Sequence, residues 1–256
     1  MQGTPFEAFQ VKEGVDATSV EGTADSPYMK SIPHYHVTLH TVKQSVPVLW
    51  WRSVGHSHTA FVMESLIDEL AHAAKLDPLD YRRQLLKDHP RHLAALNLAA
   101  EKADWGKALP KGVSRGIAVH ESFGSFVAHV AEVSVTEGKV KVHRVVSAID
   151  CGLAVNPDSL KAQMESSVSF GLGAALQSEI TFKDGMVQQS NFHDYQVLRM
   201  ADMPTVEVHI VPSAEKMGGV GEPGLPPVAP AVTNAIFAAT GKRSVACLLA
   251  TNSAKH

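Results

Sequence analysis

The sequence contains little cysteine. Its 256 residues include only Cys151 and Cys247, which lie far apart in the chain. An iron–sulfur cluster needs about four thiolate ligands, and a local metal knuckle needs cysteines close together. The chain therefore cannot hold such a cluster. If the protein performs redox chemistry, its iron–sulfur relay lies on another chain.

Strong charge of one sign and long apolar runs are also missing. The 23 basic and 26 acidic residues give a formal net charge of -3, and no Lys/Arg run suggests a nucleic-acid surface. No apolar stretch approaches the ~20 residues of a membrane span. The opening residues have neither the basic stretch nor the apolar core of an export signal. We expect no nucleic-acid partner and no direct membrane span, and the cellular compartment stays open.

Histidine is more abundant, with 14 residues. His34 and His36, and likewise His56 and His58, are spaced so that an extended strand would point each pair to one face. Such pairs can begin a zinc site, but no third ligand follows at a convincing spacing. Surface or half-buried histidines are the favoured interpretation, and we assign no metal ligand.

The first half is irregular and then helical. Residues 1–45 are polar with short extended pieces, and residues 46–58 predict an apolar strand that enters a glycine-containing turn. Helices are expected over residues 59–76, 78–88 and 92–103. The first should bury a face formed by Val62, Leu66, Ile67, Leu70, Ala73 and Ala74. Residues 109–116 indicate a linker.

The second half is richer in strands. A hairpin is expected over residues 126–150, followed by a helix with Asn156 as its N-cap and Pro157 as its first residue. That helix should bury Leu160, Met164, Val168, Leu172 and Ala175. The remaining expected elements are a hairpin over 179–189 with an Asp184–Gly185 turn, a half-buried strand over 205–211, and a helix over 229–240 closed by Gly241. This order predicts an α+β fold with helices packed on mixed sheets.

The loop GGVGEPG, residues 218–224, raises two interpretations. Gly219, Gly221 and Gly224 have the G-x-G-x-x-G spacing of a dinucleotide-binding turn. However, several prolines remove the N–H groups that a pyrophosphate needs at the following helix. No Asp or Glu follows Gly224 to bind a ribose. The dinucleotide interpretation therefore fails.

The same loop presents one carboxylate, Glu222. A solvated glutamate in a flexible turn is the ordinary interpretation. Here the flanking prolines stiffen the loop, while the glycines allow the backbone to approach a partner closely. A stiff loop that holds one carboxylate favours a general base.

At this point the sequence resembles a known family, the xanthine oxidase family of molybdenum hydroxylases. The similar stretches are VPVLWWRSVGHSHTAFVMESLIDELA, AIDCGLAVNPDSLKAQME, QSNFHDYQVLRM and GGVGEPGLPPVAPAVTNAIFAATGKR. Within the family they resemble β subunits of the isoquinoline 1-oxidoreductase type and related membrane-bound aldehyde dehydrogenase subunits. The resemblance covers essentially the whole chain.

The resemblance implies a molybdenum–molybdopterin cofactor in its cytosine dinucleotide form, and a small partner subunit with [2Fe-2S] clusters. It implies oxidation of an aldehyde or an N-heteroaromatic substrate with water as the oxygen source. The family's β subunits are much longer and carry the loops GGGFG and MGQG, which this sequence lacks. We therefore expect the C-terminal part of such a subunit, inactive without the upstream remainder. Residues 1–110 would be part of a first molybdopterin-binding region, and residues 111–256 a second.

The resemblance also implies roles for individual residues. Glu222 matches the catalytic base, and Arg52, Ser53, Val54 and Gly55 match a turn beside the molybdenum. Gln163 matches a glutamine that contacts the pterin. Gly221 directly precedes Glu222, in the loop that is expected to face the cofactor. An arginine at a strand end and a surface amide are the ordinary alternatives for Arg52 and Gln163.

One motif departs from the family. Ser166 and Ser167 stand where the family has two glycines, so packing there should differ slightly. A second function also stays open, in which the chain is a non-catalytic assembly or interaction fragment that binds no cofactor by itself.

Overall fold

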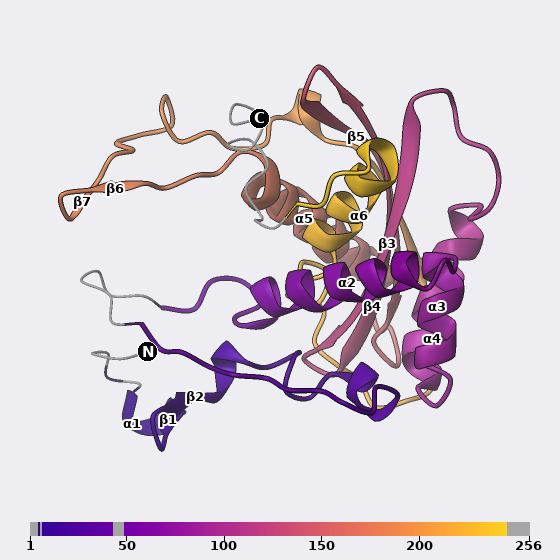
Figure 1. The fold of residues 1–256 in the computed structure, drawn as a ribbon, viewed down its shortest axis with the longest axis horizontal. Coiled ribbons are helices and arrows are strands. Elements are labelled where there is room, and N and C mark those ends of the chain that lie inside the picture. Colours follow the sequence, from indigo (N-terminus) through magenta and orange to yellow (C-terminus); the bar gives the residue numbers. More distant parts are fainter. Residues whose placement is uncertain (1–4, 6, 43–48, 245–256) are drawn as a thin grey trace.

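The centre of the molecule is a four-stranded mixed sheet. The structure is a computed structural model that describes residues 5, 7–42 and 49–244. The strands are β3 (Val113–Ser122), β4 (Ser125–Thr136), β5 (Lys139–Asp150) and β8 (Thr205–Ile210). Their order is β3-β4-β5-β8, with antiparallel pairs except for β8, which runs parallel to β5 (Figure 1). The predicted mixed-sheet α+β class is confirmed.

Both faces of the sheet are apolar because β-branched and small residues alternate along each strand. One face carries Ile117, Val119, Ala128, Val130, Val146 and Ala148. The opposite face carries Ala118, Val127, Ala131, Val133, Val145 and Ile149. A sheet with two apolar faces must be covered on both sides, and helices provide that cover.

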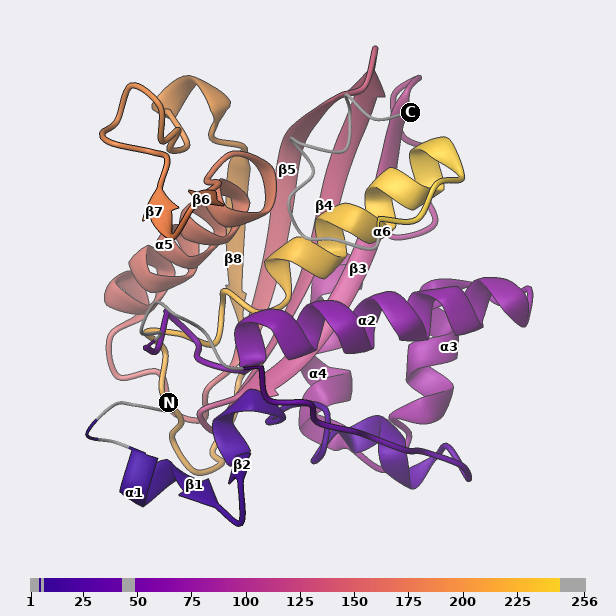
Figure 2. The same cartoon turned by 60° about the vertical axis from the view of Figure 1, so that its left-hand side comes forward.

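The first face packs against the helices of the first half. Helix α4 (Pro90–Lys102) lies across β3, β4 and β5, and its buried Leu96 and Ala99 share one core with the sheet. Helix α2 (His56–Ala73) crosses the edge strand β3, and α3 (Pro78–Leu85) connects α2 to α4 (Figure 2). The three predicted helices are confirmed, although α2 begins earlier than expected.

The opposite face packs against α5 (Pro157–Leu176) and α6 (Val228–Thr240). Asn156 caps α5, because its Oδ1 accepts a hydrogen bond from the Ser159 amide at 3.0 Å. The five residues expected on the buried face of α5 are all buried. Gly241 ends α6 with a φ of 71°, the left-handed conformation that favours glycine.

Short elements complete the described chain. They are α1 (Glu7–Gln10), β1 (Val11–Lys12), β2 (Val15–Asp16), η1 (Ala17–Ser19), η2 (Pro27–Lys30), β6 (Phe182–Lys183), β7 (Met186–Val187) and η3 (Met200–Asp202). The β6–β7 hairpin turns at Asp184–Gly185 as predicted and extends away from the sheet (Figure 1). Among the described helices, none is long and apolar enough to cross a bilayer.

Three expectations about the elements were wrong. Residues 113–116, expected in a linker, begin β3, whose alternation is hidden because both of its faces are covered. Residues 49–51 form no strand, and residues 46–48 of that prediction lie outside the described residues. His56 and His58 lie in the first turn of α2, so they do not share a strand face. The proposed division at residue 110 remains a prediction.

The buried face of α2 also differs from the expected one. Val62 and Leu66 are 53% and 39% exposed, whereas the carboxylates of Glu64 and Asp68 are buried. The buried guanidinium of Arg82 explains this rotation, because its Nε lies 2.8 Å from Glu64 and its Nη1 lies 3.5 Å from Asp68. Tyr28 donates to the second oxygen of Glu64 at 2.5 Å. A paired charge can be buried where an unpaired one cannot.

Candidate functional site

The loop that carries Glu222 lies between β8 and α6 and is anchored to neighbouring turns. The amides of Gly218 and Gly219 donate to the carbonyls of Cys151 and Phe123 at 3.0 and 2.8 Å. Ser125 Oγ donates to the Gly219 carbonyl at 2.6 Å. A side chain at Gly218 would collide with the backbone of Gly124, so glycine is needed at this close approach.

The C-terminal side of the loop is fixed as well. His129 Nε2 donates to the Gly224 carbonyl at 2.7 Å, and a Cβ at Gly224 would come within 2.8 Å of Ser167. Pro223 is buried, and the Leu225 amide donates to the Glu222 carbonyl at 3.0 Å. Glu222 therefore projects from a stiff loop, half-buried at its tip.

The second component is the turn of residues 52–55, which leads into α2. Ser53 and Val54 have φ values of 71° and 50°, in the left-handed region that non-glycine residues seldom adopt. Gly55 is required because a side chain there would overlap the Thr18 carbonyl. The Gly55 amide donates to Glu21 at 2.8 Å. Neighbouring contacts thus hold a strained turn in place.

Arg52 joins this turn to the Glu222 loop and to α5. Its Nε donates to the Gly221 carbonyl at 2.9 Å, and Nη2 contacts the same oxygen. The guanidinium also donates to Ser166 and Ser167 at 3.1 and 2.8 Å, and Nη2 lies 3.4 Å from the Gln163 side-chain oxygen. Burial lowers the pKa of Arg52, while the nearby Glu222 carboxylate raises it, with a net downward shift.

Ser53 holds Glu222 through two contacts. Its backbone amide donates to Glu222 Oε2 at 3.3 Å, and its hydroxyl donates to the Glu222 carbonyl at 2.8 Å. Within the described ranges, Glu222 Oε1 accepts no hydrogen bond. One carboxylate oxygen is therefore oriented and the other is available for a proton.

The predicted site residues thus come together in space, although they are distant in sequence. Arg52, Ser53, Gln163, Gly221 and Glu222 form one contact cluster, and Val54 and Gly55 shape its turn. Their roles toward a cofactor and a substrate remain predictions.

Sequence reasoning missed several supporting residues. His129 was not recognised as a support of the Gly224 carbonyl. Ser166 and Ser167 were noted only as a departure from the family, yet both accept hydrogen bonds from Arg52. The departure itself was the available signal, because a hydroxyl that replaces a glycine hydrogen offers a new acceptor.

The surface of this cluster fits a polar, anionic group such as the phosphate and oxo groups of a molybdopterin cofactor. Gly221 is exposed, with open space where a side chain would stand. Within the part of the chain that the structure describes, the amides of Gly221 and Glu222 have no hydrogen-bond acceptor. Free backbone N–H groups beside a cation are typical of anion-binding loops.

Side chains that could coordinate a metal ion directly do not gather here. No group of three or more His, Cys, Asp or Glu side chains in the described residues is arranged to hold a metal ion. Cys247 lies outside the described residues. Any cofactor at this cluster would therefore be held through hydrogen bonds and charge.

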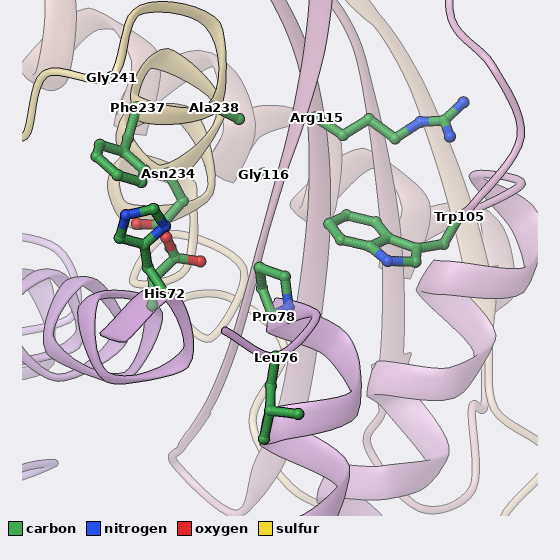
Figure 3. A pocket seen from close by; sticks show the side chains of 11 residues that line it. His72, Leu76, Pro78, Trp105, Arg115, Gly116, Asn234, Phe237, Ala238 and Gly241 are labelled. Atoms are coloured by element: carbon green, nitrogen blue, oxygen red, sulfur yellow. The ribbon is translucent and has the colours of Figure 1, made fainter. Parts of the chain in front are cut away.

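A separate cavity of about 470 Å³ lies between α2, α6 and β3 (Figure 3). Asp68 in its wall is paired with Arg243 at 2.6 Å. Trp105 Nε1 donates to Asp77, and the Asn234 amide donates to the carbonyls of Glu64 and Ile117. These polar groups are already paired, and the ring of His72, which also lines the cavity, packs edge-on against Phe237 at a centroid distance of 5.0 Å.

Comparison with known families gives two matches along the chain. Models of a molybdopterin cofactor-binding domain match residues 61–204 and residues 11–86. The first match spans more than half of the chain and includes Gln163, although it ends before Glu222.

Three curated proteins are similar to the chain over more than two thirds of its length. The chain is 36% identical over 216 residues to the beta chain of isoquinoline 1-oxidoreductase from Brevundimonas diminuta, covering 82% of this chain and 28% of the relative. It is 36% identical over 215 residues to a membrane-bound aldehyde dehydrogenase [pyrroloquinoline-quinone] of Gluconacetobacter polyoxogenes, covering 76% of this chain and 28% of that protein. A nicotinate dehydrogenase subunit of Pseudomonas putida is 33% identical over 241 residues, covering 86% and 20%. The chain thus spans less than a third of each relative.

Solved structures support the fold. Quinoline 2-oxidoreductase of Pseudomonas putida 86 superimposes with a TM-score of 0.65 at 13% identity, over 75% of this chain and 50% of that one. Aldehyde oxidoreductase of Desulfovibrio desulfuricans gives a TM-score of 0.62 at 14% identity, over 76% and 40%.

Proposed function

The chain belongs to the molybdopterin cofactor-binding subunits of the xanthine oxidase family of molybdenum hydroxylases, and on that premise we propose that it supplies the general base of such an enzyme. The reaction would be the oxidation of an aldehyde or an N-heteroaromatic substrate, with water as the oxygen source. The observation that carries the proposal is the placement of Glu222, with Oε2 held by the Ser53 amide and Oε1 open.

In this proposal, Arg52, Gln163, Gly221 and the turn of residues 53–55 would help to hold a molybdenum–molybdopterin cofactor in its cytosine dinucleotide form. The bound cofactor would supply the redox chemistry. The name of one relative carries pyrroloquinoline quinone, but the two domain matches favour molybdopterin.

The role of Glu222 follows from its surroundings. A general base must be oriented and must keep an oxygen free for the proton that it accepts. The contact at 3.3 Å from Ser53 orients the carboxylate, and the Ser53 hydroxyl fixes the backbone behind it. The anchored loop limits movement of the base away from the reacting atoms.

Further components would complete the enzyme. We propose that the rest of the molybdenum subunit and a small [2Fe-2S] subunit supply the remaining cofactor contacts and the electron relay. The chain covers only 28% of the isoquinoline 1-oxidoreductase relative, which supports further contacts from the rest of the subunit. Its two cysteines are too few for an iron–sulfur cluster, which supports an electron relay on a partner subunit. Purified alone, the chain should contain no iron–sulfur cluster and no stoichiometric molybdenum. About one molybdenum per isolated chain would contradict this arrangement.

The decisive experiment is Glu222→Gln in the assembled enzyme, because glutamine keeps the size and polarity but cannot accept the proton. General base catalysis contributes about 10²- to 10⁴-fold, so reduction of the metal centre by substrate should slow by at least about 100-fold. Metal content should be unchanged. Near-normal reduction kinetics at full metal content would show that Glu222 is not the base but an ordinary solvated glutamate in a stiff turn.

A further inference from the structure

A pair of buried histidines lies directly behind the candidate site. His56 is the first residue of α2 and follows the turn of residues 52–55. Its Nδ1 lies 2.9 Å from Nε2 of His120 on β3, and both side chains are buried. Neither residue belongs to the Glu222 cluster, and the mechanism above does not use them.

The pair is linked to both components of the site through neighbouring residues. On one side, His56 continues the turn that carries Arg52 and Ser53. On the other side, its ring meets the edge of Phe123 at a centroid distance of 5.6 Å. The Phe123 carbonyl accepts the hydrogen bond from the Gly219 amide at 2.8 Å. The His56–His120 hydrogen bond therefore lies between the strained turn of residues 52–55 and the Glu222 loop.

The surroundings of the pair set its protonation. Glu21 Oε2 lies 3.8 Å from His56 Nε2, which favours a proton on that nitrogen and leaves Nδ1 as an acceptor. His120 Nε2 would then donate. The other titratable groups nearby are Asp25 and Tyr28 in the first segment, His58 and Glu64 on α2, His92 on α4 and Glu121 on β3.

The contact requires one donor and one acceptor. If both imidazoles carry two protons, both facing nitrogens are donors and the hydrogen bond is lost. Burial lowers the pKa of both His120 and His56; Asp25 partly raises the pKa of His56, and neighbouring histidines lower the pKa of both residues further. The bond is therefore retained near neutral pH and weakens in acid.

We propose that the His56–His120 hydrogen bond positions the candidate site by holding the turn of residues 52–55 against the Phe123–Gly219 contact. Both histidines are positioning residues, since they act through Ser53 and Gly219. The inference rests on the proposed function, because it concerns residues that support the same site. Its test measures the geometry of this chain and needs no bound cofactor.

The test uses the isotope-labelled 256-residue chain and amide hydrogen exchange at Ser53 and Gly219. His120→Leu removes the donor, and exchange at both amides should become about tenfold faster, the size expected for one lost hydrogen bond. His120→Gln keeps an N–H donor at the same reach and should restore slow exchange. The matched control is His92→Leu, which removes a buried histidine that lacks this contact and should leave both amides unchanged.

Unchanged exchange in His120→Leu, or equal effects of Leu and Gln, would overturn the inference. If His120→Leu does not fold, the wild-type chain decides the question. Scalar coupling between the two ring nitrogens should report the hydrogen bond, and acidification should shift the Ser53 and Gly219 resonances at the midpoint of the pair. Absence of the coupling, or separate midpoints, would contradict the proposal. A normal rate in Glu222→Gln enzyme would instead contradict the proposed function and leave these readouts as they are.

Discussion

Glu64 and Glu222 both lie beside an arginine, and the carboxylate of each accepts a hydrogen bond from a backbone amide. Their surroundings nevertheless differ. Glu64 is fully buried, and its oxygens accept hydrogen bonds from Arg82, Tyr28 and the Val119 amide. Glu222 is half-buried, and only one of its oxygens is held. The arginines differ as well, since Arg82 bonds the carboxylate directly, whereas Arg52 bonds the backbone carbonyl behind it.

The difference indicates which carboxylate stabilises the fold and which can do chemistry. Both oxygens of the buried Glu64 carboxylate are already hydrogen-bonded, so Glu64 holds α2, α3 and β3 together. Glu222 has one oriented oxygen and one free oxygen, so it can accept a proton but contributes little to the stability of the fold. The two regions should therefore respond in opposite ways to substitution.

The largest expected effect on stability comes from Arg82→Met. This change leaves Glu64 and Asp68 without their buried partner, and breaking a buried ion pair costs about 3–5 kcal/mol. The measurement is the free energy of unfolding from denaturant titration. The matched control is Arg83→Met, which removes an exposed ion pair with Asp80 and should cost at most about 1 kcal/mol. An equal loss in the free energy of unfolding for the two variants would contradict the expected difference between the buried and the exposed ion pair.

Acid should weaken the fold through its buried histidines. Burial lowers the pKa of His92 to about 3 and that of His129 to about 4, and it also lowers those of His56 and His120. The unfolded chain therefore binds more protons than the folded chain at acidic pH. Stability should be lost as pH falls below about 6.5, by about 1.4 kcal/mol per pH unit for each such histidine.

His92→Leu tests this pH dependence. Between about pH 6 and 5, the variant should show a slope that is shallower by about one proton, or about 1.4 kcal/mol per pH unit. The exposed His193→Gln serves as the control and should leave the slope as it is. A wild-type slope in the His92 variant would show that this ring takes up its proton as readily in the folded chain as in the unfolded chain.

A smaller effect is expected for Arg52→Ala in the assembled enzyme. Loss of the contacts to Gly221, Ser166 and Ser167 should loosen the Glu222 loop, and turnover should fall by at least about tenfold, the loss expected from even one hydrogen bond to a charged group. Arg52→Lys keeps the charge but not the forked donor, so it should recover little. Unchanged turnover with lowered thermal stability would make Arg52 a packing residue.

The smallest effect should be that of Glu222→Gln on folding. Glu222 is half-buried, and its carboxylate accepts a single hydrogen bond, from the Ser53 amide at 3.3 Å. Its replacement should therefore change the free energy of unfolding by no more than about 0.5 kcal/mol. Denaturant titration of the variant and the wild-type chain measures this. A loss as large as that of Arg82→Met would place Glu222 with Glu64 among the structural carboxylates.

Local sequence was sufficient for most elements. The Asn156–Pro157 helix start, the Asp184–Gly185 turn and the Gly241 helix end were predicted because each depends on the φ preference or hydrogen bonding of one or two residues. The alternating strand of residues 205–210 was predicted because Val206, Val208 and Ile210 recur at every second position, and all three are partly buried against cores that include α5 residues.

Local sequence failed where distant partners decide the structure. Strand β3 was missed because both of its faces are covered, which removes the alternation that marks a half-buried strand. The buried side of α2 was misjudged because Arg82, 18 residues beyond Glu64, neutralises the carboxylates that would otherwise face water. Such pairings have no periodic signature in the chain.

The sequence by itself determined the family resemblance, the stiff loop around Glu222 and the chemical candidates at Arg52 and Gln163. These follow from residue types and from motifs that are continuous along the chain. Only the tertiary structure decided that Ser53 orients Glu222, that Ser166 and Ser167 bind Arg52, and that His56 meets His120. The reason is physical: each of these contacts joins residues more than sixty positions apart, and packing of α2, α5 and the final loop on one sheet brings them within hydrogen-bonding distance.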